Sequence, residues 1–356
     1  MTLIKISPVW RWFGLLWLAL QISACSTLSY YHQSLQGQME LLAARQPIDE
    51  ALADPGIPEQ VRTQLQLLKK ARQYAVTELS LPDNGSYKSY ADLHRPYVVW
   101  TVVATQALSL EPHTWCYPIF GCLAYRAYFS QADAEREAQQ LQQAGYDVYV
   151  AGIVAYSTLG WFDDPFLNTM LGWDEARLVG TLFHELAHQQ MYVPDDTEFN
   201  ESFAMTVQRE GVRRWMRQFR DEKALQAWRD AARRDEDFIG MVLKIQHTLQ
   251  TLYETSQSDE IKRLKKRELL RQLRRDYRLF RQRWSGYEGY DHWMFQDLNN
   301  AMIASVSTYH KLIPAFEALL QKSNYDMDAF YAAVKSLSLL DKEQRHARLA
   351  AVLERQ

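Results

Sequence analysis

Residues Leu178–Met191 read LVGTLFHELAHQQM and contain the pattern H-E-x-x-H in His184, Glu185 and His188. On a helix, side chains four residues apart lie on one face, so His184 and His188 can direct imidazole nitrogens at one ion. Glu185 projects about a quarter turn further round the helix, where its carboxylate can reach a water molecule on that ion without being a ligand. This arrangement is typical of zinc hydrolases, in which two imidazoles hold Zn²⁺ and a glutamate takes a proton from the water.

A catalytic zinc ion usually has three protein ligands and one water molecule. Glu201, in the segment TEFNESFA of residues 197–204, is the first candidate for the third ligand. We expect a second helix that begins at this segment with Thr197 as its N-cap, after a short turn that folds it back onto the first helix. His184, His188 and Glu201 then make a His₂Glu set for one Zn²⁺ ion.

Two patterns of zinc peptidase can be compared with this segment. In the metzincin pattern the third histidine would fall at Pro194 and a glycine at Met191, so the sequence excludes that pattern. Asn200, Glu201 and Ala204 match instead N-E-x-x-A, the ligand-helix pattern of the gluzincins.

Other acidic side chains compete with Glu201 for the role of third ligand. Glu198 lies one turn earlier on the expected helix, and Asp195 and Asp196 lie in the turn before it. Their alternative role is that of solvated charges in a turn and in the first turn of a helix. An H-E-x-x-H pattern arises by chance in roughly one or two per hundred chains of this length, so an incidental surface cluster of His and Glu is the alternative to a metal site.

Residues 1–24 are expected to be a lipoprotein signal peptide. Lys5 and Arg11 provide a positive start, and the apolar run over residues 12–24 is short for a membrane span. The sequence Ile-Ser-Ala before Cys25 resembles the lipobox of bacterial lipoproteins, which implies cleavage before Cys25 and lipidation of its thiol. Ser26 follows rather than Asp, which in such lipoproteins favours the outer membrane, so we expect a periplasmic protein anchored there. The alternative is an uncleaved N-terminal anchor with an incidental cysteine.

The composition fits a soluble body after the signal peptide. The chain has 356 residues, of which 47% are apolar and 23% charged, enough for one large or two smaller domains with a real core. Its formal net charge is −3 and becomes more negative when the basic signal segment is removed. This charge argues against a general nucleic-acid binder, and the expected partner is a peptide or an unfolded protein.

Cys116 and Cys122 flank the turn-forming residues YPIFG. In an oxidising compartment they can close a small disulfide. A structural zinc knuckle is the rival, although no third and fourth ligand of suitable spacing is present, and two free buried thiols are the remaining alternative.

The expected fold class is α+β and mostly helical, with a zincin-like peptidase body. Residues 25–80 form an N-terminal helical segment, and residues 81–356 form the body. Within the body, a small mixed β-sheet over 97–160 precedes the zinc helices over 173–218, and a C-terminal helical part occupies 219–356. Runs of β-branched and aromatic residues indicate the strands, and apolar residues at helical spacing indicate the helices.

The sheet is expected to have strands over 97–104, 123–129 and 146–156. In zincins a sheet edge usually lies above the metal, where the substrate backbone pairs with it as an added strand. Tyr156 to Gly160 is the candidate edge, and an interior strand end is the alternative.

Residues 261–284 form an expected basic helix with apolar residues near helical spacing. Its simplest interpretation is one apolar seam and one solvated face. A surface that meets anionic lipid headgroups is the alternative.

Several stretches carry a resemblance to a known family. They are LPDN at 81–84, YVVW at 97–100, WCYP at 115–118, YRAYF at 125–129, HELAHQ at 184–189, NESFA at 200–204 and NNA at 299–301. Together they resemble the predicted zinc-dependent aminopeptidases of Gram-negative bacteria, over nearly all of the chain after the signal peptide. The family has Gly where Ala127 stands, a departure that touches nothing catalytic. The resemblance implies zinc and a hydrolase, with aminopeptidase as the expected activity.

The expected mechanism assigns the role of general base to Glu185, which takes a proton from water and passes it to the leaving amine. The tetrahedral oxyanion needs a second donor besides zinc, and gluzincins commonly use a Tyr or His from a later helix. Tyr309 is the first choice and His310 the second, followed by Tyr125 and Tyr128. Packing in the core is the alternative for each of them.

The sequence leaves the choice between exopeptidase and endopeptidase open. An exopeptidase needs an acidic group for the free amine of its substrate, and Glu198 is the candidate. Two other functions compete with an aminopeptidase. One is a non-catalytic, zinc-stabilised envelope lipoprotein that binds partners, and the other is an envelope quality-control endoprotease that acts on unfolded proteins.

Overall fold

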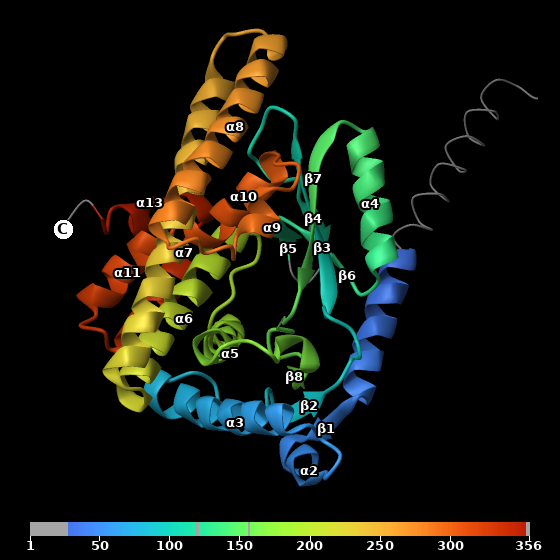
Figure 1. Cartoon of the computed structure of the whole chain (residues 1–356), viewed down its shortest axis with the longest axis vertical. Coiled ribbons are helices and arrows are strands. Elements are labelled where there is room, and N and C mark those ends of the chain that lie inside the picture. Colours follow the sequence, from blue (N-terminus) through green and yellow to red (C-terminus); the bar gives the residue numbers. More distant parts are fainter. Residues whose placement is uncertain (1–27, 118–120, 156, 354–356) are drawn as a thin grey trace, which may run out of the picture.

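The structure is a computed structural model, and it describes residues 28–117, 121–155 and 157–353 (Figure 1). The expected signal peptide and the lipidation site Cys25 lie outside these residues, so both stay predictions. No helix in the part of the chain that the structure describes is both long and apolar enough to cross a bilayer.

The described chain is mostly helical with short strands in its first half, which confirms the α+β class. The first half has a helix over residues 28–43, then β1 (Arg45–Pro47), α2 (Ile48–Ala53), α3 (Glu59–Leu79), β2 (Ser89–Ala91), β3 (Val99–Gln106), β4 (Trp115–Tyr117), β5 (Gly121–Leu123), β6 (Arg126–Tyr128), α4 (Gln131–Gln143), β7 (Tyr146–Ile153), β8 (Phe166–Leu167) and a 3₁₀ helix (Asn168–Met170). The second half has α5 (Glu175–Gln190), α6 (Thr197–Phe219), α7 (Glu222–Glu254), α8 (Asp259–Arg283), α9 (Asp291–Met294), α10 (Asn300–His310), α11 (Ile313–Lys322), α12 (Met327–Ser338) and α13 (Lys342–Ala350).

The strands form three small sheets rather than one. β3 lies between β6 and β7 and runs antiparallel to both, because α4 carries the chain from one edge of the sheet to the other. The prediction of a mixed sheet over residues 97–160 is therefore wrong. The mixed sheet is a separate one in which β2 pairs antiparallel with β1 and parallel with β8. The predicted strand over 123–129 is interrupted, since β5 ends at Leu123 and β6 begins at Arg126.

The antiparallel sheet lies between α4 and α10 (Figure 1). Successive side chains of a strand point to opposite faces, and β3 follows this rule. Val102 and Ala104 pack in the small core under α4. Thr101 and Val103 face the other way and line a cavity shared with α10. The sheet therefore presents one face to a cover helix and the other to the interior of the molecule.

A continuous apolar core joins the N-terminal helices, α5, α6 and the last three helices. In α5 the residues at helical spacing Leu178, Leu182, Phe183 and Leu186 are completely buried. Burying such a side chain contributes about 1.5–3 kcal/mol relative to leaving it exposed. The apolar stripe that predicted this helix therefore also fixes which way its histidines point.

Two glycines allow α5 and α6 to cross closely. A Cβ added to Gly180 of α5 would come within 3.0 Å of a Val212 methyl group, and one added to Gly211 of α6 would come within 2.7 Å of the Phe183 ring. No real Cβ atom fits at the second distance, so a larger residue at Gly211 would force the helices apart. The close crossing brings the H-E-x-x-H helix and the Glu201 helix into contact.

Aspartates cap both of these helices. The Asp174 carboxylate accepts a hydrogen bond from the backbone N–H of Arg177 in α5, and the Asp196 carboxylate accepts one from the N–H of Phe199 in α6. The prediction that Thr197 caps the second helix is wrong by one residue, because Asp196 has a non-helical backbone and supplies the acceptor that an N-cap needs.

The predicted basic helix is α8, which runs beside α7 as a long hairpin extending from the body (Figure 1). Leu270, Leu273 and Tyr277 are buried against α7, and the basic residues mostly face solvent. The prediction of an apolar seam with a solvated face is therefore confirmed. Contact with lipid stays an alternative that nothing in the fold tests.

Candidate metal centre

The crossing of α5 and α6 brings the three expected ligands together. The Nε2 atoms of His184 and His188 are 3.1 Å apart, and the Glu201 Oε2 atom is 3.3 Å and 3.5 Å from them. A tetrahedral zinc ion with bonds of about 2.0–2.2 Å holds its ligand atoms about 3.3–3.6 Å apart. The two distances to Glu201 fall in this range, and the distance between the imidazole nitrogens is 0.2 Å below it, so a small shift of one ring would complete the site.

The donor atoms also lack competing partners. The side chains of His184, His188 and Glu201 are 11%, 11% and 7% exposed. The Glu201 Oε2 atom is buried and, among the described residues, has no side-chain partner other than the two imidazoles. Burial of a carboxylate is unfavourable, and a cation at the centre of the three atoms would offset that cost. Two imidazoles and one carboxylate suit zinc, whereas Ca²⁺ and Mg²⁺ prefer oxygen ligands only.

The two glutamates of the site have opposite protonation behaviour. Burial alone would raise the pKa of Glu201, but the imidazoles of His188 and His184 outweigh it and lower this pKa to about 2. Burial raises the pKa of Glu185 to about 7. The charge of His184 opposes this rise, and those of Glu201 and Asp164 add to it. One carboxylate therefore stays ionised as a ligand, while the other can exchange a proton near neutral pH.

The three rival acids have other partners. The Glu198 carboxylate is 3.2 Å from the Lys311 ammonium group, and the Asp195 carboxylate accepts a hydrogen bond of 2.6 Å from the N–H of Cys122. Asp196 is the N-cap of α6. Among the described residues, the group whose ligand atoms lie within 4.8 Å of one another contains none of these three.

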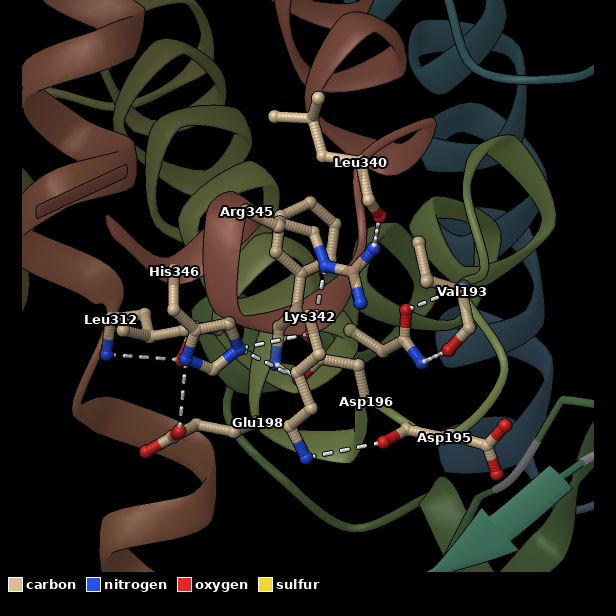
Figure 2. A network of polar contacts seen from close by, with 12 residues as sticks. Val193, Asp195, Asp196, Glu198, Leu312, Leu340, Lys342, Arg345 and His346 are labelled. Atoms are coloured by element: carbon tan, nitrogen blue, oxygen red, sulfur yellow. Dashed lines mark hydrogen bonds and ion pairs between the residues drawn. The ribbon is translucent and has the colours of Figure 1, made fainter. Parts of the chain in front are cut away.

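A buried ion pair fixes the start of the Glu201 helix (Figure 2). The Arg345 Nε atom of α13 lies 2.8 Å from the Asp196 carboxylate, and both side chains are almost completely buried. His346 contacts the same carboxylate at 2.9 Å and lies 3.7 Å from Glu198. Burial alone would raise the pKa of Asp196, but the hydrogen bonds from His346 and Arg345 prevail and lower it. The C-terminal helix thereby holds the N-terminus of α6 in place.

Replacing Arg345 with Ala is expected to reduce the free energy of unfolding by about 1.5–3 kcal/mol, because Asp196 loses one charge-assisted hydrogen bond and keeps those from His346 and the Phe199 N–H. Urea unfolding followed by circular dichroism measures this loss. Arg348→Ala is the matched control, since Arg348 is an exposed arginine on the same helix. A lowered Asp196 pKa also means that the pair stabilises the fold above about pH 4 and that this contribution disappears as the pH falls further. Equal urea midpoints for Arg345→Ala and Arg348→Ala would contradict the predicted loss of stability.

A cleft of about 620 Å³ opens beside the metal ligands. Its lining includes His184 and Glu185, the end of β7 with the two residues after it (152–155), and Trp173 just before α5. Side chains of α5, α6 and α10 complete it, among them Arg177, Thr181, Met205, Gln208 and Tyr309. Glu198 does not line it, so the structure does not support Glu198 as the acceptor for a substrate amine. β7 is an edge strand of the described sheet, and its end borders the cleft.

The sheet edge with which a substrate could pair lies earlier in the sequence than predicted. Residues 157–160 form no strand, since 157 and 158 are irregular and 159 and 160 form a turn, and Tyr156 lies outside the described residues. The sheet edge that borders the cleft is instead the end of β7 at Gly152 and Ile153, and the cleft continues along residues 154 and 155. Gly152 lies there close to the ring of Tyr97, and a side chain at this position would collide with that ring.

The candidate oxyanion donors divide into two groups. Tyr309 lines both the cleft and a second cavity of about 250 Å³, which Tyr125 and His310 also line. Burial raises the pKa of Tyr309 well above its usual value, and the Glu201 charge adds to the effect, so the phenol keeps its proton. Burial lowers the pKa of His310 to about 4, which keeps the ring neutral. Tyr128 instead packs in the core under α4, away from the ligands.

A polar network behind the histidines was missed from the sequence. The Gln189 side chain of α5 accepts a 2.7 Å hydrogen bond from Asn84 and donates to Ser86, Ser157 and Asp164. Burial raises the pKa of Asp164 to about 6. The network ties α5 to two loops and so fixes the rotation of the helix. Two features of the sequence could have indicated this network. One is the position of Gln189 directly after H-E-x-x-H, and the other is the turn around Asn84.

The structure joins Cys116 and Cys122 by a disulfide, and these residues face each other across the β4–β5 hairpin. The hairpin also contacts the turn before α6, through the hydrogen bond from Cys122 to Asp195. The crosslink therefore borders the segment that leads to Glu201.

Comparisons with known proteins gave one match. A family model described as "putative aminopeptidase" matches residues 29–349. No curated protein and no solved structure matches the chain. The zincin-like part of the predicted fold therefore stays a prediction.

Proposed function

The chain belongs to the family described as "putative aminopeptidase", and from this premise we propose that it is a zinc-dependent peptidase that shortens peptides from the N-terminus. One observation carries the proposal: three ligand atoms lie 3.1–3.5 Å apart beside Glu185, at the wall of an open cleft. The family match supports a peptidase in general, and the arrangement of His184, His188 and Glu201 supports zinc.

A zinc ion held by these residues would supply Lewis-acid catalysis and lower the pKa of a water molecule toward neutrality. Glu185 accepts the proton of the attacking water and later passes it to the leaving amine. Its position beside His184 and its pKa near 7 suit both transfers. The end of β7 offers backbone groups with which an extended substrate can pair as an added strand.

Tyr309 is the proposed donor to the oxyanion that forms at the substrate carbonyl. It lines the cleft together with His184 and Glu185, and its phenol stays protonated at neutral pH. Tyr309→Phe is expected to lower kcat about 10²- to 10³-fold with little change in KM, because only the transition state loses a hydrogen bond. Steady-state hydrolysis of one good peptide measures both constants.

Two further variants make the Tyr309 test specific. Tyr128→Phe removes a phenol oxygen far from the cleft and serves as the control. Tyr125→Phe tests the neighbouring phenol of the second cavity. A large loss of kcat in Tyr125→Phe but not in Tyr309→Phe would transfer the role to Tyr125.

We also propose that the protein acts in the periplasm, anchored through lipidated Cys25, on peptides or unfolded proteins. The small-residue run before Cys25 supports the anchor. Labelling of cells with a radioactive fatty acid would distinguish the native chain from Cys25→Ala, which should carry no label.

Peptide hydrolysis tests the proposed function. The zinc-loaded protein is mixed with a peptide library, and the products are identified by mass spectrometry, beside a sample treated with a chelator. Ladders of single N-terminal losses that return when zinc is restored are expected. Internal cuts would identify an endopeptidase of the quality-control kind. No cleavage by a zinc-containing protein would favour a non-catalytic lipoprotein that binds partners.

A further inference from the structure

The charged groups of the cleft are unusual for an enzyme that would hold a free amine. Its described lining contains one carboxylate side chain, that of Glu185, and one guanidinium side chain, that of Arg177. Glu185 is assigned to proton transfer. The remaining permanent charge is therefore positive, and a positive group attracts a carboxylate and repels an ammonium group.

Arg177 lies on the same face of α5 as the metal ligands. Arg177, Thr181, His184 and His188 follow one another at intervals of four, three and four residues, the spacing of one helical stripe. The first three of them line the cleft. Seven residues of helix separate Arg177 from His184, about 10 Å along the axis, which equals about three residues of an extended peptide.

The Arg177 guanidinium is held in place by an aromatic ring. Its central carbon lies 3.7 Å from the centre of the Trp173 ring, which also lines the cleft. Stacking on an indole stabilises a guanidinium group and leaves its N–H groups, which lie in the plane, free to bind a carboxylate.

No nearby acidic residue in the described part of the chain forms a close ion pair with this guanidinium, although Asp235 lies near enough for Arg177 to oppose the rise of its pKa on burial. No carboxylate of the described residues lies within 4.0 Å of the Arg177 guanidinium. The Glu175 carboxylate accepts hydrogen bonds from Trp215 and Arg220. Asp174 caps α5, and the Asp235 carboxylate is bound by the Tyr290 hydroxyl group. Arg177 therefore keeps its donors available toward the cleft.

We propose that Arg177, stacked on Trp173, is a carboxylate-binding subsite of the substrate cleft. The inference rests on the proposed peptidase function and specifies its substrate class. Preferred substrates are peptides with a carboxylate about three residues from the scissile bond. For an enzyme that acts on the N-terminus, a free C-terminus at that distance defines short oligopeptides, and an acidic side chain at that distance offers the same chemistry.

Two series of matched peptides test the subsite with the zinc-loaded full chain. The first series has three to six residues, each peptide with either a free or an amidated C-terminus. The second series is amidated throughout and carries Glu or Gln at successive positions. A carboxylate at the right distance is expected to raise kcat/KM about 10-fold, within the range of a charge-assisted hydrogen bond. In Arg177→Gln, the ratio of kcat/KM for the acidic peptide to kcat/KM for its neutral partner should fall to about one.

Arg217→Gln is the matched control. Arg217 is an exposed arginine near the end of α6 that does not line the cleft, so its replacement should leave the ratio unchanged. A preference restricted to the first series identifies the substrate C-terminus as the occupant, and one restricted to the second series identifies an acidic side chain. Equal kcat/KM values within all wild-type pairs, or a preference that survives in Arg177→Gln, would overturn the subsite and leave the zinc peptidase intact.

A binding measurement separates failure of the subsite from failure of the enzyme. Calorimetric titration of the same peptides into Glu185→Gln reports affinity without turnover. Tighter binding of the acidic members, lost in Glu185→Gln/Arg177→Gln, would support the subsite even if no peptide is hydrolysed. Equal affinities for acidic and neutral members would reject it.

Discussion

Glu185→Gln is expected to lower kcat about 10²- to 10⁴-fold while zinc remains bound, because glutamine keeps the size of the side chain but cannot accept a proton. The atoms expected to hold zinc belong to His184, His188 and Glu201, and the substitution changes none of them. Hydrolysis of the best peptide from the library, together with the zinc content of the same sample, measures both parts of this prediction.

Glu198→Gln is the matched control for that variant. It makes the same acid-to-amide change on the neighbouring helix, at a carboxylate that pairs with Lys311 and does not line the cleft. Its kcat should stay close to that of the wild type. A Glu185→Gln protein with wild-type turnover would remove Glu185 from the mechanism, and one without zinc would make Glu185 a ligand instead.

His188→Ala is expected to lower the affinity for zinc by more than about 100-fold and to reduce hydrolysis below detection. Loss of a group that merely orients a ligand already costs about 10- to 100-fold in affinity, and loss of the ligand itself should cost more. Competition with a chromophoric chelator measures the dissociation constant. Because binding to the folded state alone stabilises it, zinc should also raise the Tm of the wild type and not that of His188→Ala.

His247→Ala is the control for the ligand variant, since His247 is an exposed histidine of α7 outside the cleft lining. It should bind zinc as the wild type does. A His188→Ala protein that binds zinc with unchanged affinity would place the metal elsewhere in the chain.

The ligand set could be predicted because it depends on local rules. Helical periodicity puts His184 and His188 on one face, and a turn of a few residues limits how far Glu201 can lie from them. The rivals could not be rejected in the same way. Asp196 is occupied by Arg345, a residue 149 positions later in the chain, and no local pattern predicts such a partner.

Features that depend on distant packing were predicted less well. The strands over 97–160 were recognised from their composition, but their directions follow from the path of α4 across the sheet. The N-cap was misplaced by one residue because Asp196 and Thr197 are both good caps and adjacent. Arg177 shares the stripe of His184, yet its importance depends on the cleft above it, which the sequence does not reveal.

The central claim is that His184, His188 and Glu201 hold one zinc ion, and native mass spectrometry of the protein tests it most directly. One zinc per chain is expected in the wild type and in Glu185→Gln, and none in His188→Ala at the same zinc concentration. A wild-type protein that binds no zinc, or a His188→Ala protein that binds it fully, would contradict the claim.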